Sequence, residues 1–176
     1  MTIDGVRVFQ LTNYSDNRGI FTNLWSENYE VFQEFGFSCR QINLSENKMA
    51  GTVRGFHFQV SPDEECKVVF CTQGAIQDVL IDLRPDSVTF GKSMTIELGE
   101  QLDRAILIPK MVGHGFQTLV DNTSVMYLHS GIYNKTSERG INPLDKTLAI
   151  PWKLPPSVIS DRDLNLQSFQ EFVADL

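Results

Sequence analysis

The segment Thr52–Gln59, Thr-Val-Arg-Gly-Phe-His-Phe-Gln, places a guanidinium and an imidazole inside a run that is otherwise typical of a buried β-strand. Arg54 and His57 must therefore be solvated, paired or functional, because an unpartnered polar group is costly in an apolar environment. An imidazole titrates near neutral pH and suits a general base. The alternative for His57 is a core histidine that hydrogen-bonds to the backbone.

Three further residues could work with such a base. Lys67 begins another apolar run, Tyr127 lies within Ser124–Ser130, and His114 lies between two glycines. An ammonium can stabilise an enolate, and a phenol can donate a proton from the opposite face. A base, a cation and an acid that converge would suit proton transfer next to a carbonyl group. The structural alternatives are a solvated lysine, a core tyrosine and a histidine in a tight glycine-rich turn.

Two carboxylates near the C-terminus, Asp161 and Asp163, have two interpretations. They could cap a helix or remain solvated. Alternatively, one of them returns to His57 and orients its imidazole.

A metal site is a further alternative, because two histidines in a β-barrel resemble the cupins. The usual first cupin motif is His-x-His followed by Glu, but here Gln59 occupies the second histidine position. Glu64 or Glu65 could still act as a ligand, although two histidines and one glutamate form a reduced set. We therefore expect no catalytic metal.

The elements that must position these residues are short. Apolar runs alternate with turn signals such as Asp16–Gly19, Ser61–Asp63 and Arg84–Asp86, which predicts a β-sandwich or barrel. The expected strands are Arg40–Leu44, Thr52–Gln59, Lys67–Thr72, Ala75–Leu83, Ser93–Leu98, Ala105–Ile108 and Ser124–Ser130. Short helices are expected over Glu27–Phe35 and Ser168–Ala174.

Strand alternation assigns side chains to faces. Gln41 and Asn43 share one face. Arg54 and His57 should point to opposite faces unless Gly55 introduces a β-bulge, which a glycine within a strand often does.

Composition limits the class of protein. The 176 residues, 41% hydrophobic and 21% charged, suit a single all-β domain over residues 1–176. A net charge of −7 argues against nucleic-acid binding, which needs clustered Lys and Arg. Three cysteines without CxxC spacing favour a reducing compartment. With no signal-peptide pattern and no membrane-spanning run, we expect a cytoplasmic protein that does not bind membranes.

A long ordered series of motifs then resembles the dTDP-4-dehydrorhamnose 3,5-epimerase family of nucleotide-sugar epimerases, over nearly the whole chain. The first half contributes Asp16-x-Arg18-Gly19-x-Phe21, Gln41-Ile42-Asn43-x-Ser45, Val53-Arg54-Gly55-Phe56-His57-Phe58-Gln59, Lys67-Val68-Val69 and Asp78-Val79-x-x-Asp82-x-Arg84. The second half contributes Ser87-x-Thr89-Phe90-Gly91, Ile108-Pro109, Gly113-His114-Gly115-Phe116, Tyr127, Tyr133, Glu138-x-Gly140-Ile141, Trp152 and Ser160-x-x-Asp163.

This resemblance implies a cupin-type jelly-roll β-barrel with short peripheral helices, no metal or other cofactor, and a homodimer with strand exchange. The implied substrate is a nucleoside-diphosphate 4-keto-6-deoxy sugar. The simplest case is conversion of dTDP-4-dehydro-6-deoxyglucose to dTDP-4-dehydrorhamnose in the biosynthesis of a glycan such as lipopolysaccharide.

The resemblance also implies the residue roles. His57 is the base, Asp163 its orienting partner, Tyr127 the acid, and Lys67 the cation at the enolate oxygen on carbon 4. The implied substrate-binding residues are Arg18 and Arg54 at the diphosphate, Gln41 and Asn43 at the sugar, His114 nearby, and Phe21, Asp78 and Tyr133.

Three departures from the family pattern leave alternatives open. Asn23 replaces a typical Glu, Leu128 a frequent Lys, and Pro143-Leu144 part of a usual Trp-Asn-Asp. The enzyme could therefore act at one carbon only or take a GDP- or CDP-sugar. A 3,4-ketoisomerase is disfavoured because Lys67 and Tyr127 match the epimerase pattern. A non-catalytic sugar-binding protein is disfavoured because every candidate catalytic residue is present.

Overall fold

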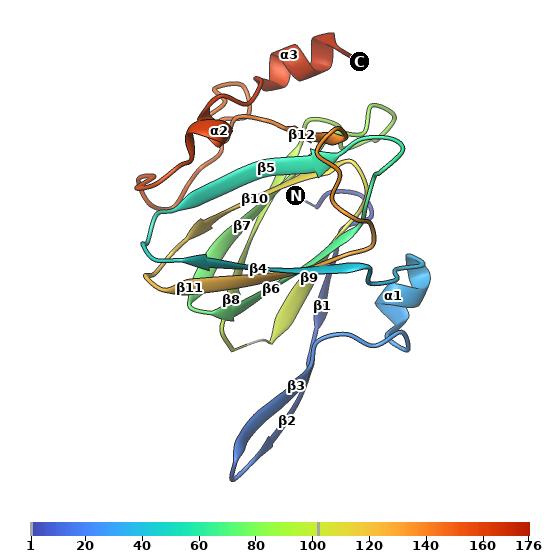
Figure 1. Cartoon of the computed structure of the whole chain (residues 1–176), viewed down its shortest axis with the longest axis vertical. Helices are drawn as coiled ribbons and strands as arrows, with labels where there is room; N and C mark the ends of the chain where they lie inside the picture. Colours follow the sequence, from blue (N-terminus) through green and yellow to red (C-terminus); the bar gives the residue numbers. More distant parts are fainter. Residues whose placement is uncertain (1, 102) are drawn as a thin grey trace.

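The computed structural model describes residues 2–101 and 103–176, and within them two five-stranded antiparallel sheets face each other (Figure 1). The first, the β6 sheet, has the order β1 (Arg7–Gln10), β9 (Arg104–Ile108), β6 (Lys67–Gln73), β11 (Thr123–His129) and β4 (Gln41–Asn47). The second, the β5 sheet, has the order β12 (Glu138–Gly140), β5 (Val53–Gln59), β10 (Val112–Thr118), β7 (Ala75–Asp82) and β8 (Ser93–Gly99). This all-β architecture confirms the predicted jelly-roll barrel.

The core between the two sheets follows from strand alternation. Along β6, Val69 and Cys71 point inward and pack against Ile76, Leu80 and Phe116 from the opposite sheet. All five side chains are almost completely buried. Burial of each large apolar side chain stabilises the fold by roughly 1.5–3 kcal/mol, and this core holds the sheets at the separation that the site requires.

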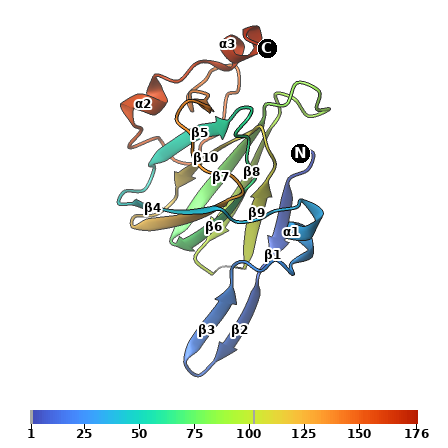
Figure 2. The same cartoon turned by 45° about the vertical axis from the view of Figure 1, so that its right-hand side comes forward.

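The outer face of each sheet is also covered. Helix α1 (Glu30–Glu34) places Phe32 against the β6 sheet, next to Val68 and Phe70. Helices α2 (Asp161–Leu164) and α3 (Phe169–Ala174) lie over the β5 sheet (Figure 2).

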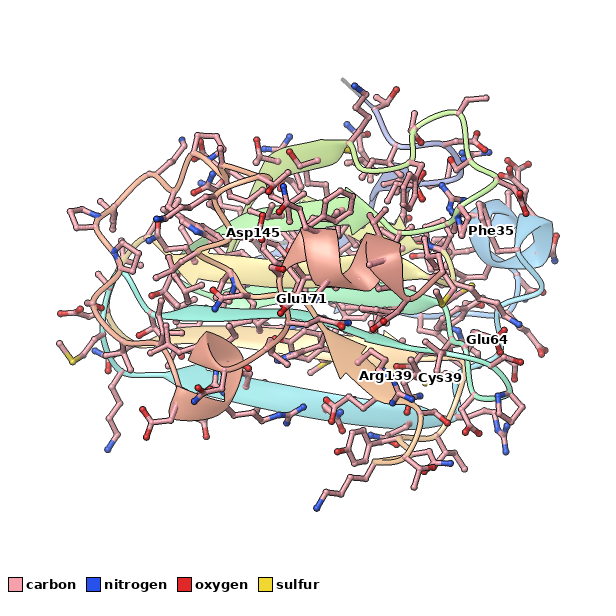
Figure 3. The ribbon with its side chains drawn as sticks, turned by 90° about the horizontal axis from the view of Figure 1, so that it is seen from above. Phe35, Cys39, Glu64, Arg139, Asp145 and Glu171 are labelled. Carbon is pink, nitrogen blue, oxygen red and sulfur yellow. The ribbon has the colours of Figure 1, made fainter. Side chains whose placement is uncertain are left out.

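A capping box holds the start of α3. The Ser168 hydroxyl accepts from the Glu171 N–H, and the Glu171 carboxylate accepts from the Ser168 N–H. The Asp145 carboxylate in turn accepts from the Phe169 N–H at 3.0 Å. Seen from above, α3 lies over the strands, while Phe35 lies with α1 at the periphery (Figure 3). The C-terminal segment is therefore fastened over β5.

A hairpin of β2 (Thr12–Asp16) and β3 (Gly19–Asn23) projects away from the barrel (Figure 1). Its side chains are largely solvent-exposed, including Tyr14, Ile20 and Phe21 at 62%, 67% and 69%. Such a cluster of exposed apolar side chains is a feature of interaction surfaces.

The structure confirms all seven expected strands and the helix near the C-terminus, while α1 is shorter than expected. It corrects the alternative of a tight glycine-rich turn around His114, because β10 begins at Val112 and pairs along its length with β7. The strands β1, β2, β3 and β12 and the helix α2 were not predicted. None of the helices in the described residues is long and apolar enough to cross a bilayer.

Candidate active site

A cavity of about 560 Å³ opens between the two sheets. The β5 sheet contributes Arg54 and His57 from β5 and His114 from β10. The β6 sheet contributes its own polar face, and the loop before β12 adds Tyr133. The lining residues from the β6 sheet and its flanks include Gln41, Asn43, Ser45, Glu65, Lys67, Tyr127 and His129.

A β-bulge explains why Arg54 and His57 both line this cavity. His57 pairs with His114 and Arg54 with Phe116, so β5 spans three residues where β10 spans two. The bulged segment of β5 contains Gly55, which has φ +121°. A Cβ at this position would lie 2.5 Å from the Gly115 Cα. The predicted β-bulge at Gly55 is therefore confirmed. It brings Arg54 and His57 to the same face, because a bulge rotates one side chain relative to the other.

His57 pairs with Asp163 of α2. The His57 Nε2 lies 2.8 Å from Asp163 Oδ1, and the other carboxylate oxygen accepts from the Gly55 N–H at 3.2 Å. Ser160 caps α2 by accepting from the Asp163 N–H. Since an ionised carboxylate only accepts hydrogen bonds, Nε2 carries a proton and Nδ1 is the nitrogen that can act as a base.

The Asp163 carboxyl is itself held ionised. Its burial opposes the charged form, but the hydrogen bond and charge of His57 and the Gly55 N–H together lower the pKa of Asp163. The negative charge stabilises the imidazolium that forms when His57 accepts a proton.

Lys67 crosses the cavity from the β6 sheet. Its ammonium donates to the His57 carbonyl oxygen at 3.3 Å and lies 3.8 Å from Glu65 Oε1. Burial lowers the pKa of Lys67, while the charges of Glu65 and Glu138 act in the opposite direction. These carboxylates therefore favour the ammonium form that an enolate oxygen needs as its partner.

Tyr127 lies on the same sheet as Lys67 and opposite His57. Burial and the charge of Asp78 raise the pKa of Tyr127, while Arg54 and a hydrogen bond with Ser45 act in the opposite direction. The phenol therefore stays protonated at neutral pH and is available as a proton donor. A base on one sheet and an acid on the other can address opposite faces of a bound molecule.

His114 lines the cavity, but Asp78 does not. Asp78 is fully buried behind the imidazole, with its Oδ1 2.6 Å from His114 Nε2. Asp78 therefore holds the His114 imidazole, and its expected contact with the substrate stays a prediction.

The other expected binding residues divide into two groups. Gln41, Asn43, Arg54 and Tyr133 line the cavity with His114. Arg18 and Phe21 do not, because they lie on the projecting β2–β3 hairpin. The Arg18 guanidinium pairs with Asp16 at the hairpin tip rather than with any group of the cavity. These two residues therefore do not line the cavity of their own chain, and their contact with a substrate stays a prediction.

Two buried ionisable residues of the cavity were not expected there as active-site groups. His129 follows Tyr127 by two residues in β11, so alternation alone places both on one face. Glu65 was considered only as a metal ligand, and no local pattern relates it to His129. The imidazole Nδ1 lies 3.1 Å from Glu65 Oε1.

No group of three or more His, Cys, Asp or Glu side chains within residues 2–101 and 103–176 is arranged to hold a metal ion. Gln59, at the usual ligand position, uses its amide elsewhere. It donates to the carbonyl oxygens of Asp63 and Ile132 and accepts from the Asn134 N–H. These bonds fasten the loop that carries Tyr133.

Comparison with known proteins shows which family the chain resembles. The family model described as dTDP-4-dehydrorhamnose 3,5-epimerase matches residues 1–171. The chain is 38% identical over 165 residues to the dTDP-4-dehydrorhamnose 3,5-epimerase of Mycobacterium tuberculosis (strain ATCC 25618 / H37Rv), covering 91% of this chain and 81% of that relative. It is 36% identical over 163 residues to a dTDP-4-dehydrorhamnose 3-epimerase of Streptomyces niveus, covering 92% and 78%.

A solved structure is also similar. The dTDP-6-deoxy-D-glucose-3,5-epimerase of Legionella pneumophila Philadelphia 1, in complex with dTDP-4-keto-L-rhamnose, superimposes with a TM-score of 0.90 at 30% identity. The match covers 99% of this chain and 93% of that one. A family model over almost the whole chain and relatives above 30% identity lead to one conclusion: this chain belongs to the dTDP-4-dehydrorhamnose 3,5-epimerase family of isomerases.

Proposed function

We propose that the protein inverts carbon 3 and carbon 5 of dTDP-4-dehydro-6-deoxyglucose, giving dTDP-4-dehydrorhamnose. The observation that carries the proposal is the pairing of His57 with Asp163 on one wall of a cavity whose opposite wall holds Lys67 and Tyr127. This is the set of groups that an enolate mechanism requires.

The chemistry follows from the ketone at carbon 4, which acidifies the protons on its two neighbouring carbons. His57 removes one proton through Nδ1, and Lys67 stabilises the enolate oxygen. Tyr127 delivers a proton to the opposite face, which inverts the carbon. General acid–base catalysis contributes roughly 10²–10⁴-fold, and charge stabilisation by a positioned donor contributes a comparable factor.

The choice of nucleotide rests on the relatives, since those above act on or bind dTDP-linked sugars by name. The Streptomyces niveus relative, named as a 3-epimerase, supports a second candidate that acts at carbon 3 alone. We retain both. The odd cysteine count continues to favour a cytoplasmic location.

We also propose a homodimer in which the β2–β3 hairpin of one copy completes the site of the other. Two exposed apolar surfaces support it: the hairpin with Ile20 and Phe21, and the outer edge of β4 with Ile42 and Leu44 at 62% and 57% exposure. Exchange of the hairpin would bring Arg18 and Phe21 to a nucleotide bound in the partner copy.

The test is proton exchange in deuterated water with dTDP-4-dehydro-6-deoxyglucose, followed by NMR at each sugar carbon. Deuterium at carbons 3 and 5, with inversion at both, is the expected result. Exchange and inversion at carbon 3 alone would favour the second candidate. Exchange at neither carbon by folded protein would contradict both.

A further inference from the structure

A line of hydrogen bonds runs along the cavity wall and joins β4, β11 and the two loops that carry Tyr133 and Glu65. The Tyr133 N–H donates to Gln41 Oε1 at 3.0 Å, and Gln41 Nε2 donates to Asn43 Oδ1 at 3.0 Å. Asn43 Nδ2 lies 3.2 Å from His129 Nε2, and His129 Nδ1 lies 3.1 Å from Glu65 Oε1. We call this set the polar relay.

The two ends of the polar relay determine its direction. A backbone N–H can only donate, so the Gln41 oxygen must face Tyr133, and its nitrogen must face Asn43. Asn43 then presents its oxygen to Gln41 and its nitrogen to His129. Because that nitrogen donates, His129 Nε2 must accept and therefore carries no proton. The proton lies on Nδ1 and is donated to Glu65, whose carboxylate can only accept.

The far end of the polar relay is buried. The side chains of His129 and Glu65 are only 11% and 5% exposed. Reversing the direction would leave two donors facing each other at Tyr133 and Gln41, which costs the desolvation of an unmade hydrogen bond. Glu65 and His129 thus favour one orientation of both amides.

We propose, on the basis of the proposed function, that Glu65 and His129 are positioning residues. They hold the Gln41 and Asn43 amides so that N–H groups are available to oxygen atoms of the sugar substrate. Each amide nitrogen has a second hydrogen that the polar relay does not use. Gln41 and Asn43 line the cavity, so these hydrogens suit the hydroxyl or carbonyl oxygens of a keto sugar. Specificity for such oxygens then depends on two residues that need not touch the substrate.

Glu65 has a second role, because its Oε1 also lies 3.8 Å from the Lys67 ammonium. Its charge opposes the lowering of the Lys67 pKa by burial. One carboxylate therefore links the amides that bind the sugar to the cation that stabilises the enolate. The two roles can be separated, since only the second needs a negative charge.

The first test concerns the free wild-type protein. The His57 and His114 Nε2 atoms face carboxylates, whereas His129 presents Nδ1 to one. Long-range ¹H–¹⁵N spectra of ¹⁵N-histidine-labelled protein at neutral pH should therefore show one histidine with a protonated Nδ1 and a bare Nε2. Its signals should disappear in His129→Gln. A His129 that is protonated on Nε2, alone or together with Nδ1, would overturn the proposal.

The second test compares two variants of His129. His129→Phe retains a ring but neither accepts from Asn43 nor donates to Glu65, so KM should rise about tenfold, as expected for a lost hydrogen bond, with a smaller change in kcat. His129→Gln can both accept and donate, and should restore most of the affinity. Equal KM values for His129→Phe and wild type, or equal losses in both variants, would contradict the polar relay.

Glu65→Gln separates the two roles of Glu65. The amide oxygen still accepts from His129, so KM should stay within about twofold of wild type, whereas kcat should fall because Lys67 loses a counter-charge. A change in KM with kcat unaffected would contradict this division.

The outcomes distinguish this inference from the proposed function. Absence of exchange by wild-type protein with the dTDP-sugar would refute the proposed function while leaving the tautomer of His129 to be decided by NMR. Normal exchange with the other tautomer would refute the polar relay alone. If His129→Phe does not fold, the wild-type spectrum still decides.

Discussion

At the scale of single residues, the proposed reaction depends most on His57. Replacing it by Asn removes the basic Nδ1 while retaining an amide that can still donate to Asp163. We expect His57→Asn to reduce deuterium incorporation at carbons 3 and 5 by at least about 10²-fold, the usual contribution of a general base. Near-normal exchange by the variant, with wild-type circular dichroism and melting temperature, would exclude His57 as the base.

Tyr127 serves a different step, so its removal should separate exchange from inversion. In Tyr127→Phe, His57 can still remove a proton and return deuterium to the same face while Lys67 holds the enolate oxygen. The substitution should therefore slow deuterium incorporation less than it slows inversion at carbons 3 and 5. The free energy of unfolding should fall by about 1 kcal/mol, the net value of one hydrogen bond. Inversion of either carbon at the wild-type rate by folded Tyr127→Phe would show that Tyr127 is not the acid there.

At the scale of elements, the bulge in β5 depends on Gly55. An alanine there would suffer both the strain of φ +121° and a Cβ contact of 2.5 Å with Gly115. We expect Gly55→Ala to lower the free energy of unfolding by more than about 2 kcal/mol and to abolish activity, because β5 and β10 must separate.

Gly19 offers a matched control for this substitution. Its φ is +128°, but a Cβ added there would meet no atom of a residue beyond its chain neighbours within 4 Å, among the residues that the structure describes. Gly19→Ala thus carries the backbone strain without the collision. Urea unfolding should show the smaller loss for Gly19→Ala, and an equal loss would mean that the close approach of β5 to β10 contributes nothing.

The connection between β7 and β8 is held by Asp82. Its carboxylate accepts from the Arg84 guanidinium and from the Ser87 and Thr89 hydroxyls. Burial opposes its ionisation, but these bonds lower the pKa of Asp82 from 3.8 to about 2. This shift corresponds to about 2 kcal/mol of unfolding free energy at neutral pH.

The sign of the pH dependence follows from the lowered pKa. The stabilisation is complete well above the ordinary pKa of 3.8 and is lost as the pH falls through this value towards about 2, where the folded protein takes up the proton. Asp82→Asn should therefore be about 2 kcal/mol less stable than wild type at pH 7, and the gap in urea unfolding should narrow below pH 4. Asp86→Asn, at an exposed position of the same loop, is the control and should match wild type at both pH values. A gap that does not depend on pH would contradict this account.

At the scale of the whole molecule, the projecting hairpin predicts an assembly of two copies. Burying exposed apolar side chains such as Ile20 and Phe21 favours association by about 25 cal/mol per Å². Sedimentation should show a dimer for wild type, and Ile20→Asp should shift it towards monomer with a rise in KM. Val88→Asp, at a position that is 92% exposed elsewhere, should remain dimeric. A monomeric wild-type protein with full activity would refute hairpin exchange.

The sequence by itself determined the all-β class, the main strands and the catalytic candidates, because apolar alternation and turn residues act over a few neighbouring positions. Alternation could not settle whether Arg54 and His57 share a face, since that depends on how Gly55 packs against Gly115 of another strand. Asp163 remained ambiguous between capping a helix and orienting His57, and the contact that resolves it spans 106 residues. The pairing of Glu65 with His129 likewise arose only when the sheets closed, because long-range packing decides which polar groups meet.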